Sequence, residues 1–587
     1  MKTTAKNTGF ACYLLFCLLA CSNGTDGEQA ANDATMTDEA VTADAASADQ
    51  IFTNARIYTL NSSQPWAESI AVKDGRILAV GTAAEVDTHR GNMSELVDVE
   101  GRMLMPGIHD MHNHPTEAGI RELYECGFPL ASLEEVITII TECRENTPAG
   151  EWIRGGQWSE ALFTTDQSPR SILDEISTQH PIYMMDWTVH NAWVNSAALE
   201  RFGIDADTPD PGGGIIGRDP ANGEATGILY DNAAYLYRRQ LPAYTQEQLV
   251  RALTWSIGEL IGFGVTSFKD AIVTEDTLKA YHTIDQERGL PARVKASLTW
   301  KSAWAESNEK EIELIESRGE YSSEMLDTEF AKIMLDGIPL TYTSALLEPY
   351  LPSEGFGDNH YGAMMLDYDE LIQDVVELDR QGITVKIHAT GDRAVRSALD
   401  AFEAARAANG DSGLVHEVSH AAMIHPDDLP RFKALNVAAE MCPILWYPWP
   451  DGGYTEMVGE ERAKAWAIRT LTELGGLVIY GSDWPAVVPD ANPWPGIEAM
   501  VTRANPYGLS PGADWPEQAV DLETAVQIFT LNGATAAKTP ELTGSLEVGK
   551  AADFIVLDRN IFEVPIEEVS DTQVMITVVN GNRVYER

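Results

Sequence analysis

The chain has 587 residues, a hydrophobic content of 44% and a formal net charge of −49 at pH 7. This length and composition fit one large globular domain together with a smaller one. The strong negative charge repels phosphate groups, so nucleic acids and anionic membrane surfaces are excluded as expected partners.

The N-terminus has the pattern of an export signal. Lys2 and Lys6 precede an apolar run over 10–20, which is too short to span a bilayer comfortably. The run ends in Leu-Leu-Ala followed by Cys21, which resembles the bacterial lipoprotein signal, whose cysteine is lipidated and becomes the new N-terminus. We therefore expect residues 1–20 to be a signal peptide. A plain signal peptide that contains a cysteine is the alternative.

The next segment, 21–50, is expected to be a disordered acidic tether. Residues 22–50 hold seven acidic residues and no Lys or Arg, and such a segment cannot bury enough apolar surface to order itself. Ser22 after Cys21 resembles the sorting preference of outer-membrane lipoproteins. This predicts a lipid-anchored protein on the periplasmic side of the outer membrane or at the cell surface, with no other membrane contact.

Three of the six cysteines fall after the predicted signal and tether, namely Cys126, Cys143 and Cys442. They are few and widely spaced, so neither a disulfide framework nor a zinc-finger spacing is present. A single bridge between Cys126 and Cys143 would require an oxidising compartment. Two buried thiols are the alternative, and the sequence leaves both open.

Short strand patterns occur at both ends of the folded body, in 51–105 and again in 540–587. Lys73-Asp74-Gly75 and Asn580-Gly581-Asn582 are turn signals between strands. The predicted strands are 51–60, 69–72, 76–81, 95–105, 544–549, 553–557 and 574–585. These two segments together predict a small β-sandwich built from both chain ends.

The middle of the chain, 106–539, alternates apolar runs with helical patterns. The apolar runs are 182–185, 265–268, 330–335, 384–387 and 477–480, and the predicted helices are 133–144, 246–261, 368–380, 394–408 and 462–474. Such alternation over about 400 residues favours a parallel sheet closed by helices. We therefore predict the α/β class, with a (β/α)8 TIM-like barrel that carries insertions.

The stretch 105–115 holds the first candidate metal ligands. His112 and His114 are two residues apart, so on a strand they point to the same face and suit one metal ion. Asp110 shares that face, whereas His109 points to the other one and is left out of the site. An isolated pair of this kind is otherwise typical of two loop histidines.

Four further candidate ligands follow predicted strands, where the carboxyl ends of barrel strands are expected: Lys332, His388, His420 and Asp483. Lys332 lies inside an apolar run, where a cation is costly to bury. A lysine that snorkels or that pairs with Asp336 is the alternative. Together these nitrogen and oxygen donors suit Zn²⁺, although the sequence does not decide between zinc, iron and manganese.

These motifs resemble the amidohydrolase superfamily, in particular the amidohydrolase-3 type that includes N-substituted formamide deformylases and exoenzyme regulatory protein-like hydrolases. The resemblance runs from about residue 52 to the C-terminus. The matching blocks are Pro-Gly-x-x-Asp-x-His-x-His at 106–114, Gly-Val-Thr-Ser at 264–267, Lys332 with Asp336-Gly337, His-Ala-x-Gly-Asp-Arg-Ala at 388–394, and Gly-Ser-Asp at 481–483. Ser419 departs from the pattern, because the family usually has Glu before this histidine.

The resemblance implies a binuclear centre with a carbamate on Lys332, derived from CO₂, bridging the two metals. One metal would be held by His112, His114, Lys332 and Asp483, and the other by Lys332, His388 and His420. Two such ions lower the pKa of a bridging water towards neutrality, so that a metal-bridging hydroxide is the nucleophile. Asp483 would accept its proton as general base and return it to the leaving amine as general acid.

Four residues are candidates for substrate contact. His190 lies in a segment that resembles the His-x-x-x-Val-Asn-Ser block, and it could hydrogen-bond the substrate carbonyl or be purely structural. Trp158 could line an apolar pocket, although most tryptophans belong to the core. Arg393 and Arg462 could bind a substrate carboxylate, and salt bridges at helix ends are the alternative.

The leading hypothesis is a metal-dependent hydrolase that cleaves an amide or other C–N bond of a small molecule. An esterase or lactonase on the same site is a second enzyme hypothesis. A surface lipoprotein that binds a ligand without catalysis is a third, which Asp483 disfavours because a pure binder does not need a base. The substrate and the oligomeric state, including a homodimer, stay open.

Overall fold

The computed structural model describes residues 47–128, 132–163, 167–302, 307–353, 357–448, 454–486, 488 and 490–587. The predicted signal peptide, Cys21 and the tether up to residue 46 lie outside these residues. The last part of the predicted tether is structured, because the first strand already begins at Gln50. Asp49 accepts a hydrogen bond of 2.6 Å from Lys73 Nζ, which ties this part of the chain to a neighbouring strand.

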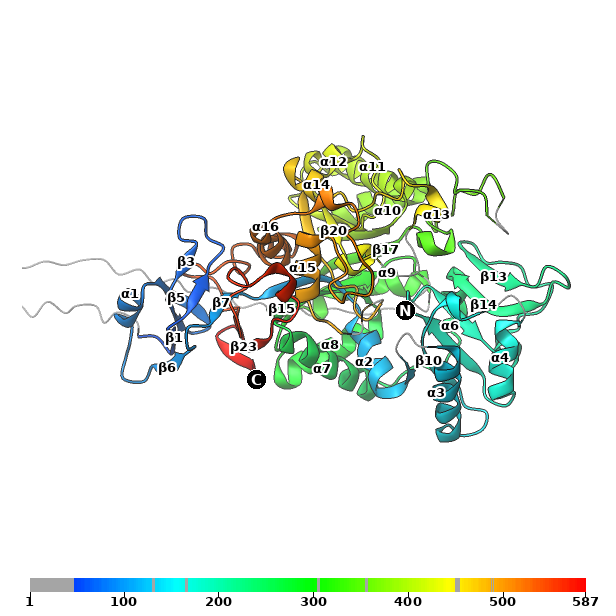
Figure 1. Ribbon diagram of the computed structural model, residues 1–587, viewed down its shortest axis with the longest axis horizontal. Coiled ribbons are helices and arrows are strands. Elements are labelled where there is room, and N and C mark those ends of the chain that lie inside the picture. Colours follow the sequence, from blue (N-terminus) through cyan, green and yellow to red (C-terminus); the bar gives the residue numbers. More distant parts are fainter. Residues whose placement is uncertain are drawn as a thin grey trace, which may run out of the picture. The chain divides into compact units, whose positions relative to one another are not determined.

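Two sheets form the predicted sandwich. One holds strands from the N-terminal end alone, and the other combines strands from both ends of the chain, which appear in blue and red in Figure 1. The strands are β1 (Gln50–Thr53), β2 (Arg56–Tyr58), β3 (Trp66–Ala67), β4 (Ser69–Lys73), β5 (Arg76–Gly81), β6 (Glu95–Asp98), β7 (Met103–Pro106), β22 (Phe554–Leu557), β23 (Val574–Val579) and β24 (Asn582–Glu586). Their orders are β5-β4-β1-β6 and β24-β23-β22-β7-β2-β3. Phe52, Leu104 and Phe554 are fully buried in the shared core, so the predicted sandwich is confirmed.

Three strand predictions at the chain ends were wrong in detail. The predicted strand 95–105 is divided at Glu100, whose φ is 58°, into β6 in one sheet and β7 in the other. The predicted strand 51–60 is broken at Asn54, whose positive φ of 54° turns the chain from β1 in one sheet to β2 in the other. The predicted strand 544–549 forms turns instead, and Gly544 has a φ of 86°.

Eight parallel strands form the barrel, in the order β21-β20-β19-β18-β17-β16-β15-β8. They are β8 (Ile108–Asn113), β15 (Val265–Val273), β16 (Arg293–Thr299), β17 (Leu326–Met334), β18 (Thr384–Ala389), β19 (His416–His420), β20 (Val437–Met441) and β21 (Leu477–Tyr480). The first and last strands meet where the Asp483 N–H donates to the His112 carbonyl at 2.8 Å. The predicted (β/α)8 barrel is confirmed.

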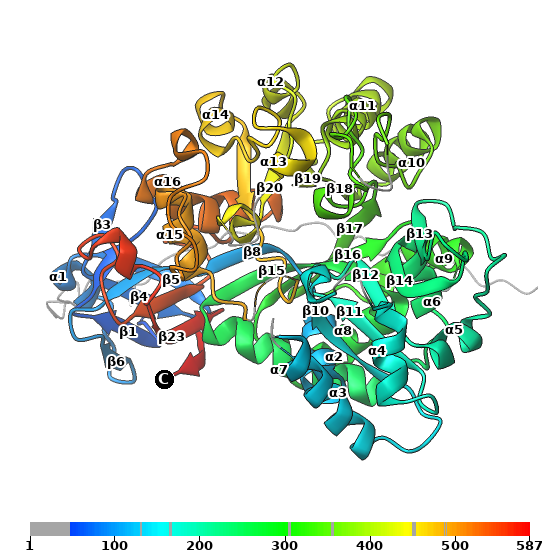
Figure 2. The same ribbon diagram turned by 45° about the vertical axis from the view of Figure 1, so that its right-hand side comes forward.

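Helices cover the outside of the barrel (Figure 2). They are α2 (Pro115–Tyr124), α7 (Gln246–Gly262), α8 (Glu275–Arg288), α9 (Asn308–Ser317), α10 (Tyr368–Arg380), α11 (Asp392–Asn409), α12 (Leu429–Ala434), α14 (Ile468–Glu473), α15 (Trp494–Thr502) and α16 (Leu522–Gln527). Helix α14 is shorter than the predicted helix 462–474. Helix α7 begins after Thr245, which forms a capping box with Gln248.

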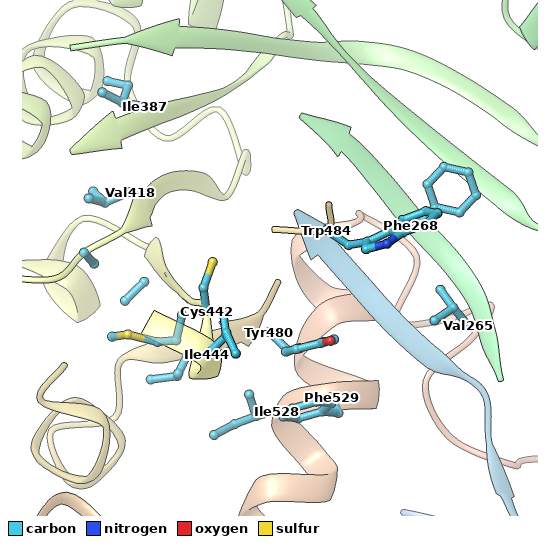
Figure 3. Packing of buried hydrophobic residues seen from close by; sticks show 14 of the residues in the cluster. Val265, Phe268, Ile387, Val418, Cys442, Ile444, Tyr480, Trp484, Ile528 and Phe529 are labelled. Atoms are coloured by element: carbon cyan, nitrogen blue, oxygen red, sulfur yellow. The ribbon is translucent and has the colours of Figure 1, made fainter. Parts of the chain in front are cut away.

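Apolar side chains fill the space between the strands and the outer layer. Tyr480 of β21 stacks on Phe529 with 3.8 Å between ring centroids, and Phe268 and Trp484 pack nearby around the barrel (Figure 3). Among the helices that the structure describes, none is long and apolar enough to cross a membrane.

An insertion between β8 and β15 forms a separate six-stranded sheet, cyan in Figure 2, in the order β13-β14-β12-β11-β10-β9. Its elements are β9 (Cys126–Gly127), β10 (Ile153–Trp158), β11 (Ile182–Asp186), β12 (Asn191–Val194), β13 (Gly214–Arg218), β14 (Ala225–Asp231), α3 (Leu133–Asn146), α4 (Pro169–Ile176), α5 (Ser196–Phe202) and α6 (Asn232–Arg238). The apolar run 182–185 therefore belongs to this sheet and not to the barrel. A disulfide joins Cys126 to Cys143, and Cys442 is a buried free thiol.

A single residue, Gly107, joins sandwich strand β7 to barrel strand β8. A Cβ atom at this position would lie 2.1 Å from Thr266 Oγ1 on the neighbouring strand β15. Only glycine therefore lets the two strands follow each other so closely.

Candidate metal centre

The six predicted ligands line one cavity of about 310 Å³ at the carboxyl ends of the barrel strands. They lie in or directly after β8 (His112, His114), β17 (Lys332), β18 (His388), β19 (His420) and β21 (Asp483). Residues separated by up to 371 positions in the sequence, counted from 112 to 483, thus meet at one site. This is the edge of the barrel at which the sequence placed them.

Two of these residues adopt strained backbone conformations. His420 has a φ of 66° and Asp483 a φ of 59°, both in the left-handed region. For residues with a Cβ this costs on the order of 1–3 kcal/mol each. In this backbone conformation both side chains line the cavity at the ends of their strands.

The imidazole rings form a compact group around the carboxylate. The ring centroids of His112 and His420 are 4.9 Å apart, and those of His388 and His420 are 4.6 Å apart. Asp483 Oδ1 lies 3.2 Å from His114 Nε2 and 3.4 Å from His112 Nε2. These donor atoms are close enough to share one cation.

Three histidines have one ring nitrogen held by the protein. The Nδ1 atom of His112 contacts the Glu440 carboxylate and lies 2.7 Å from Ser419 Oγ. His388 Nε2 lies 3.2 Å from the Gly337 carbonyl, and His420 Nδ1 lies 3.5 Å from the Cys442 thiol. The other ring nitrogen stays available in each case, which is the arrangement that fixes the tautomer of metal-binding histidines.

The same histidines are neutral over the physiological pH range. Burial lowers the pKa of His112 and His388 well below the usual value, and it lowers the pKa of His420 to about 3. A neutral imidazole has the free lone pair that a metal ion requires.

Lys332 is 2% exposed and makes no ion pair with any carboxylate that the structure describes. Burial and the nearby Lys386 ammonium lower the pKa of Lys332 to about 8. The alternative partner Asp336 instead accepts hydrogen bonds from the backbone N–H groups of Ala345, Thr390 and Gly391, at 2.9, 3.0 and 2.9 Å. Asp336 therefore organises the loops around the site and does not neutralise the lysine.

The donor set fits divalent cations such as zinc, because it combines neutral imidazoles with a carboxylate in a buried cavity. The sequence analysis missed Glu440, which is fully buried at the end of β20 and holds His112 in place. The signal was present, since an acidic residue inside the apolar run 437–441 is as unusual as Lys332 in its own run.

His190 also lines the cavity, and it was expected there as a substrate contact. Its Nδ1 atom lies 2.8 Å from Asp231 Oδ1, and its ring centroid is 5.5 Å from that of His388. Burial alone would lower the pKa of His190, but the Asp231 carboxylate outweighs this and raises it. Asp231 was missed from the sequence, because its contact with His190 and its φ of 46° are visible only in the structure.

Three predicted substrate contacts are not among the residues that line this cavity. Trp158 is fully buried in the insertion, where its Nε1 donates to the Met184 carbonyl at 2.8 Å. Arg462 donates to three backbone carbonyls, and Arg393 lies in the first turn of α11. The structure assigns Trp158 to packing and Arg462 to holding a loop.

The barrel and its buried donor cluster define a metal-dependent hydrolase. Residues 95–585 match the model of the amidohydrolase family, so the chain belongs to that family. It is an enzyme of the class that hydrolyses carbon–nitrogen bonds other than peptide bonds.

Relatives of known sequence and structure span nearly the whole chain. The chain is 30% identical over 555 residues to the protein LONG AFTER FAR-RED 3 of Arabidopsis thaliana, covering 92% of each. It is 29% identical over 549 residues to an N-substituted formamide deformylase of Arthrobacter pascens, covering 92% of this chain and 98% of the relative. An uncharacterized metal-dependent hydrolase from Pyrococcus horikoshii has a similar structure, with a TM-score of 0.68, 25% identity and coverage of 88% and 99%.

Proposed function

We propose that this protein uses two divalent cations to hydrolyse the amide C–N bond of a small molecule. The observation that carries the proposal is the convergence of six donor residues on one buried cavity, with Lys332 among them and without an acidic partner in the described part of the chain. The similarity to an N-substituted formamide deformylase supports an amide as the bond that is cleaved.

Lys332 would carry a carbamate in the loaded enzyme. A lysine ammonium repels cations, whereas a carbamate is anionic and offers two oxygen atoms to two metals. His112, His114 and Asp483 would hold one cation, and His388 and His420 the other. Bound cations would polarise the scissile carbonyl and make a water molecule more acidic.

Asp483 and His190 would divide the remaining chemistry. Asp483 accepts a proton from the attacking water and returns it to the leaving amine nitrogen, which needs a carboxylate close to both. His190 donates a hydrogen bond to the carbonyl oxygen as negative charge develops there. Asp231 fixes the ring of His190 through the bond to Nδ1.

Metal analysis combined with a hydrolysis screen tests this function. Purified protein should contain stoichiometric divalent metal and should release an amine from at least one of a set of formamides, N-acyl amino acids and cyclic amides. Protein supplied with ¹³C-bicarbonate should show a carbamate carbon in its NMR spectrum that is absent in Lys332→Met. A metal-free preparation, or hydrolysis of esters and lactones alone, would contradict the proposal.

We further propose that the protein is exported and anchored by a lipid on Cys21. The disulfide between Cys126 and Cys143 supports this location, because such bonds persist in oxidising compartments. Mass spectrometry of the N-terminal peptide should find a diacylglyceryl group on Cys21. In Cys21→Ala the protein should leave the membrane fraction, and an unmodified Cys21 in the wild type would contradict the anchor.

A further inference from the structure

The cavity extends beyond the metal ligands to a wall of charged side chains from α2, the insertion and the loop before α7. The charged residues of this wall are Glu117, Glu125, Arg154, Arg238 and Arg239, with Asp270 and Asp276 on the barrel side. None of them belongs to the predicted metal site. We call the first five the charged wall, and its internal pairing indicates what kind of substrate it accepts.

The central pair of the charged wall is Glu117 with Arg238. Arg238 Nη2 lies 2.6 Å from both carboxylate oxygens of Glu117. The side chain of Arg238 is only 18% exposed and that of Glu117 only 15%. The positive charge of Arg238 lowers the pKa of Glu117 despite burial. Each charge is therefore neutralised by the other inside the cavity.

The other members of the charged wall have neutral partners and opposite charges nearby. Burial and Glu117 raise the pKa of Glu125, and the Arg238 and Arg154 charges act against this. Burial lowers the pKa of Arg239, and the Glu311 carboxylate acts against this. Glu125 accepts a hydrogen bond of 2.7 Å from Tyr244 Oη. The Arg154 guanidinium lies 4.3 Å from the centroid of the Tyr244 ring and donates to the Pro242 carbonyl at 2.8 Å. Arg239 donates to the carbonyl of Ser302.

The two acidic residues on the barrel side have a neutral partner or are exposed. Asp270 is buried and accepts a hydrogen bond of 2.9 Å from Tyr281 Oη, whereas Asp276 is exposed at the rim. Between these polar groups the lining is apolar and comes from Ile120, Met185, Leu241, Leu249, Ile272 and Met334.

We propose that this cavity selects amides whose substituent is uncharged and apolar, a substrate class that rests on the proposed hydrolase function. A charged substituent would lose its water on entering the cavity and would meet no unmatched opposite charge on the wall. An apolar substituent gains from contact with the aliphatic lining and leaves the internal pairs intact. Specificity thus comes from charges that the protein has already paired.

Three probes of the same shape test the proposal on the metal-loaded protein. They are N-(4-ethylbenzyl)formamide and the two analogues in which a carboxylate or an aminomethyl group replaces the ethyl group. Turnover is measured as kcat/KM, and binding is measured separately by the shift in Tm. The neutral probe should exceed both charged probes in kcat/KM by about 100-fold or more, since a desolvated charge without a partner is strongly unfavourable.

Substitutions in the central pair should redirect this preference. Glu117→Gln leaves the Arg238 charge unmatched and should raise kcat/KM for the carboxylate probe relative to the neutral probe by about 10-fold or more. Arg238→Met should do the same for the aminomethyl probe. The double variant removes both charges and should restore the preference for the neutral probe, even if either single variant folds poorly.

A matched control removes a carboxylate from an ion pair outside the cavity. Glu224→Gln breaks the contact with Arg170, whose Nη2 lies 3.0 Å away in the same insertion, and should leave the order of the three probes unchanged. Equal kcat/KM values for the charged and neutral probes would overturn the selectivity while leaving the hydrolase function intact. Selective binding without turnover would overturn the hydrolase function alone, and no binding of any probe would overturn the selectivity.

Discussion

Two sets of buried polar residues in and around the barrel have the same residue types in opposite states of pairing. Lys386 lies on β18 two residues before His388, and its Nζ is 3.0 Å from Glu417, 3.3 Å from Glu440 and 2.6 Å from the Met111 carbonyl. Lys332 on the neighbouring strand has no such partner among the described residues. Lys386 completes a charge network, whereas Lys332, its register partner on β17, lines the cavity.

Two histidines on β19 show the same contrast. His416 Nε2 lies 2.9 Å from Asp379 Oδ1, and its Nδ1 accepts a hydrogen bond of 3.0 Å from the Val385 N–H. Both ring nitrogens are used, so His416 cannot bind a metal. His420, four residues later, keeps one nitrogen for the cavity. The comparison teaches that unused bonding capacity, and not residue type, separates functional from structural polar groups in this core.

The largest expected effect comes from Asp483→Asn in the cavity. The amide cannot accept the proton, so kcat should fall by about 10³-fold or more. Steady-state kinetics on the best amide of the screen, with metal content measured on the same sample, checks this. Unchanged turnover in a fully metal-loaded variant would remove Asp483 from the role of base.

A pair of lysine variants tests the comparison directly. Lys386→Met leaves Glu440 without a lysine partner and Glu417 with Lys269 alone, so the free energy of unfolding should drop by about 3–5 kcal/mol. Lys332→Met should lose metal and activity with little loss of stability, because it has no partner to strand. Urea denaturation of both metal-free proteins measures the difference. An equal loss of stability in the two variants would contradict the distinction between the paired and the unpaired lysine.

Glu440 connects the paired lysine to the cavity, since it contacts both Lys386 and His112. Glu440→Gln keeps the shape but weakens the hold on the His112 ring, so the affinity for metal should fall by about 10–100-fold. Competition with a metal chelator measures this. Ser419→Ala removes a hydroxyl that contacts both His112 and Glu440 but keeps the Glu440 carboxylate on the ring, so it should have a smaller effect.

The smallest expected effect is that of Asp231→Asn, at a residue that lies behind His190 and does not line the cavity itself. Asp231 raises the pKa of His190, so the protonated ring persists to a higher pH in the wild type than in the variant. Activity that depends on the protonated ring is lost as pH rises through this pKa, and the alkaline limb of kcat/KM should move to lower pH in Asp231→Asn. We expect about a 10-fold loss at pH 8. An unshifted limb would assign that limb to another group.

The convergence of the six candidate ligands could be predicted from the regular geometry of strands and barrels. Alternation along a strand places His112 and His114 on one face, and parallel strands bring their carboxyl ends to one edge. Glu440 and Asp231 escaped notice because their roles depend on contacts with distant segments. Trp158 was ambiguous since an apolar ring suits a core and a pocket equally well. The run 182–185 has the same apolar pattern whether it lies in a barrel or in a separate sheet.

The one-residue link at Gly107 couples the assembly of the barrel to that of the sandwich. The strand before it, β7, hydrogen-bonds to β22, and β22 follows the whole barrel in the chain. The strand after it carries His112. The strand that carries the first candidate ligand is thus joined directly to a strand whose partner is made after the last of them. The seam between sandwich and barrel can close only once the C-terminal strands have been synthesised.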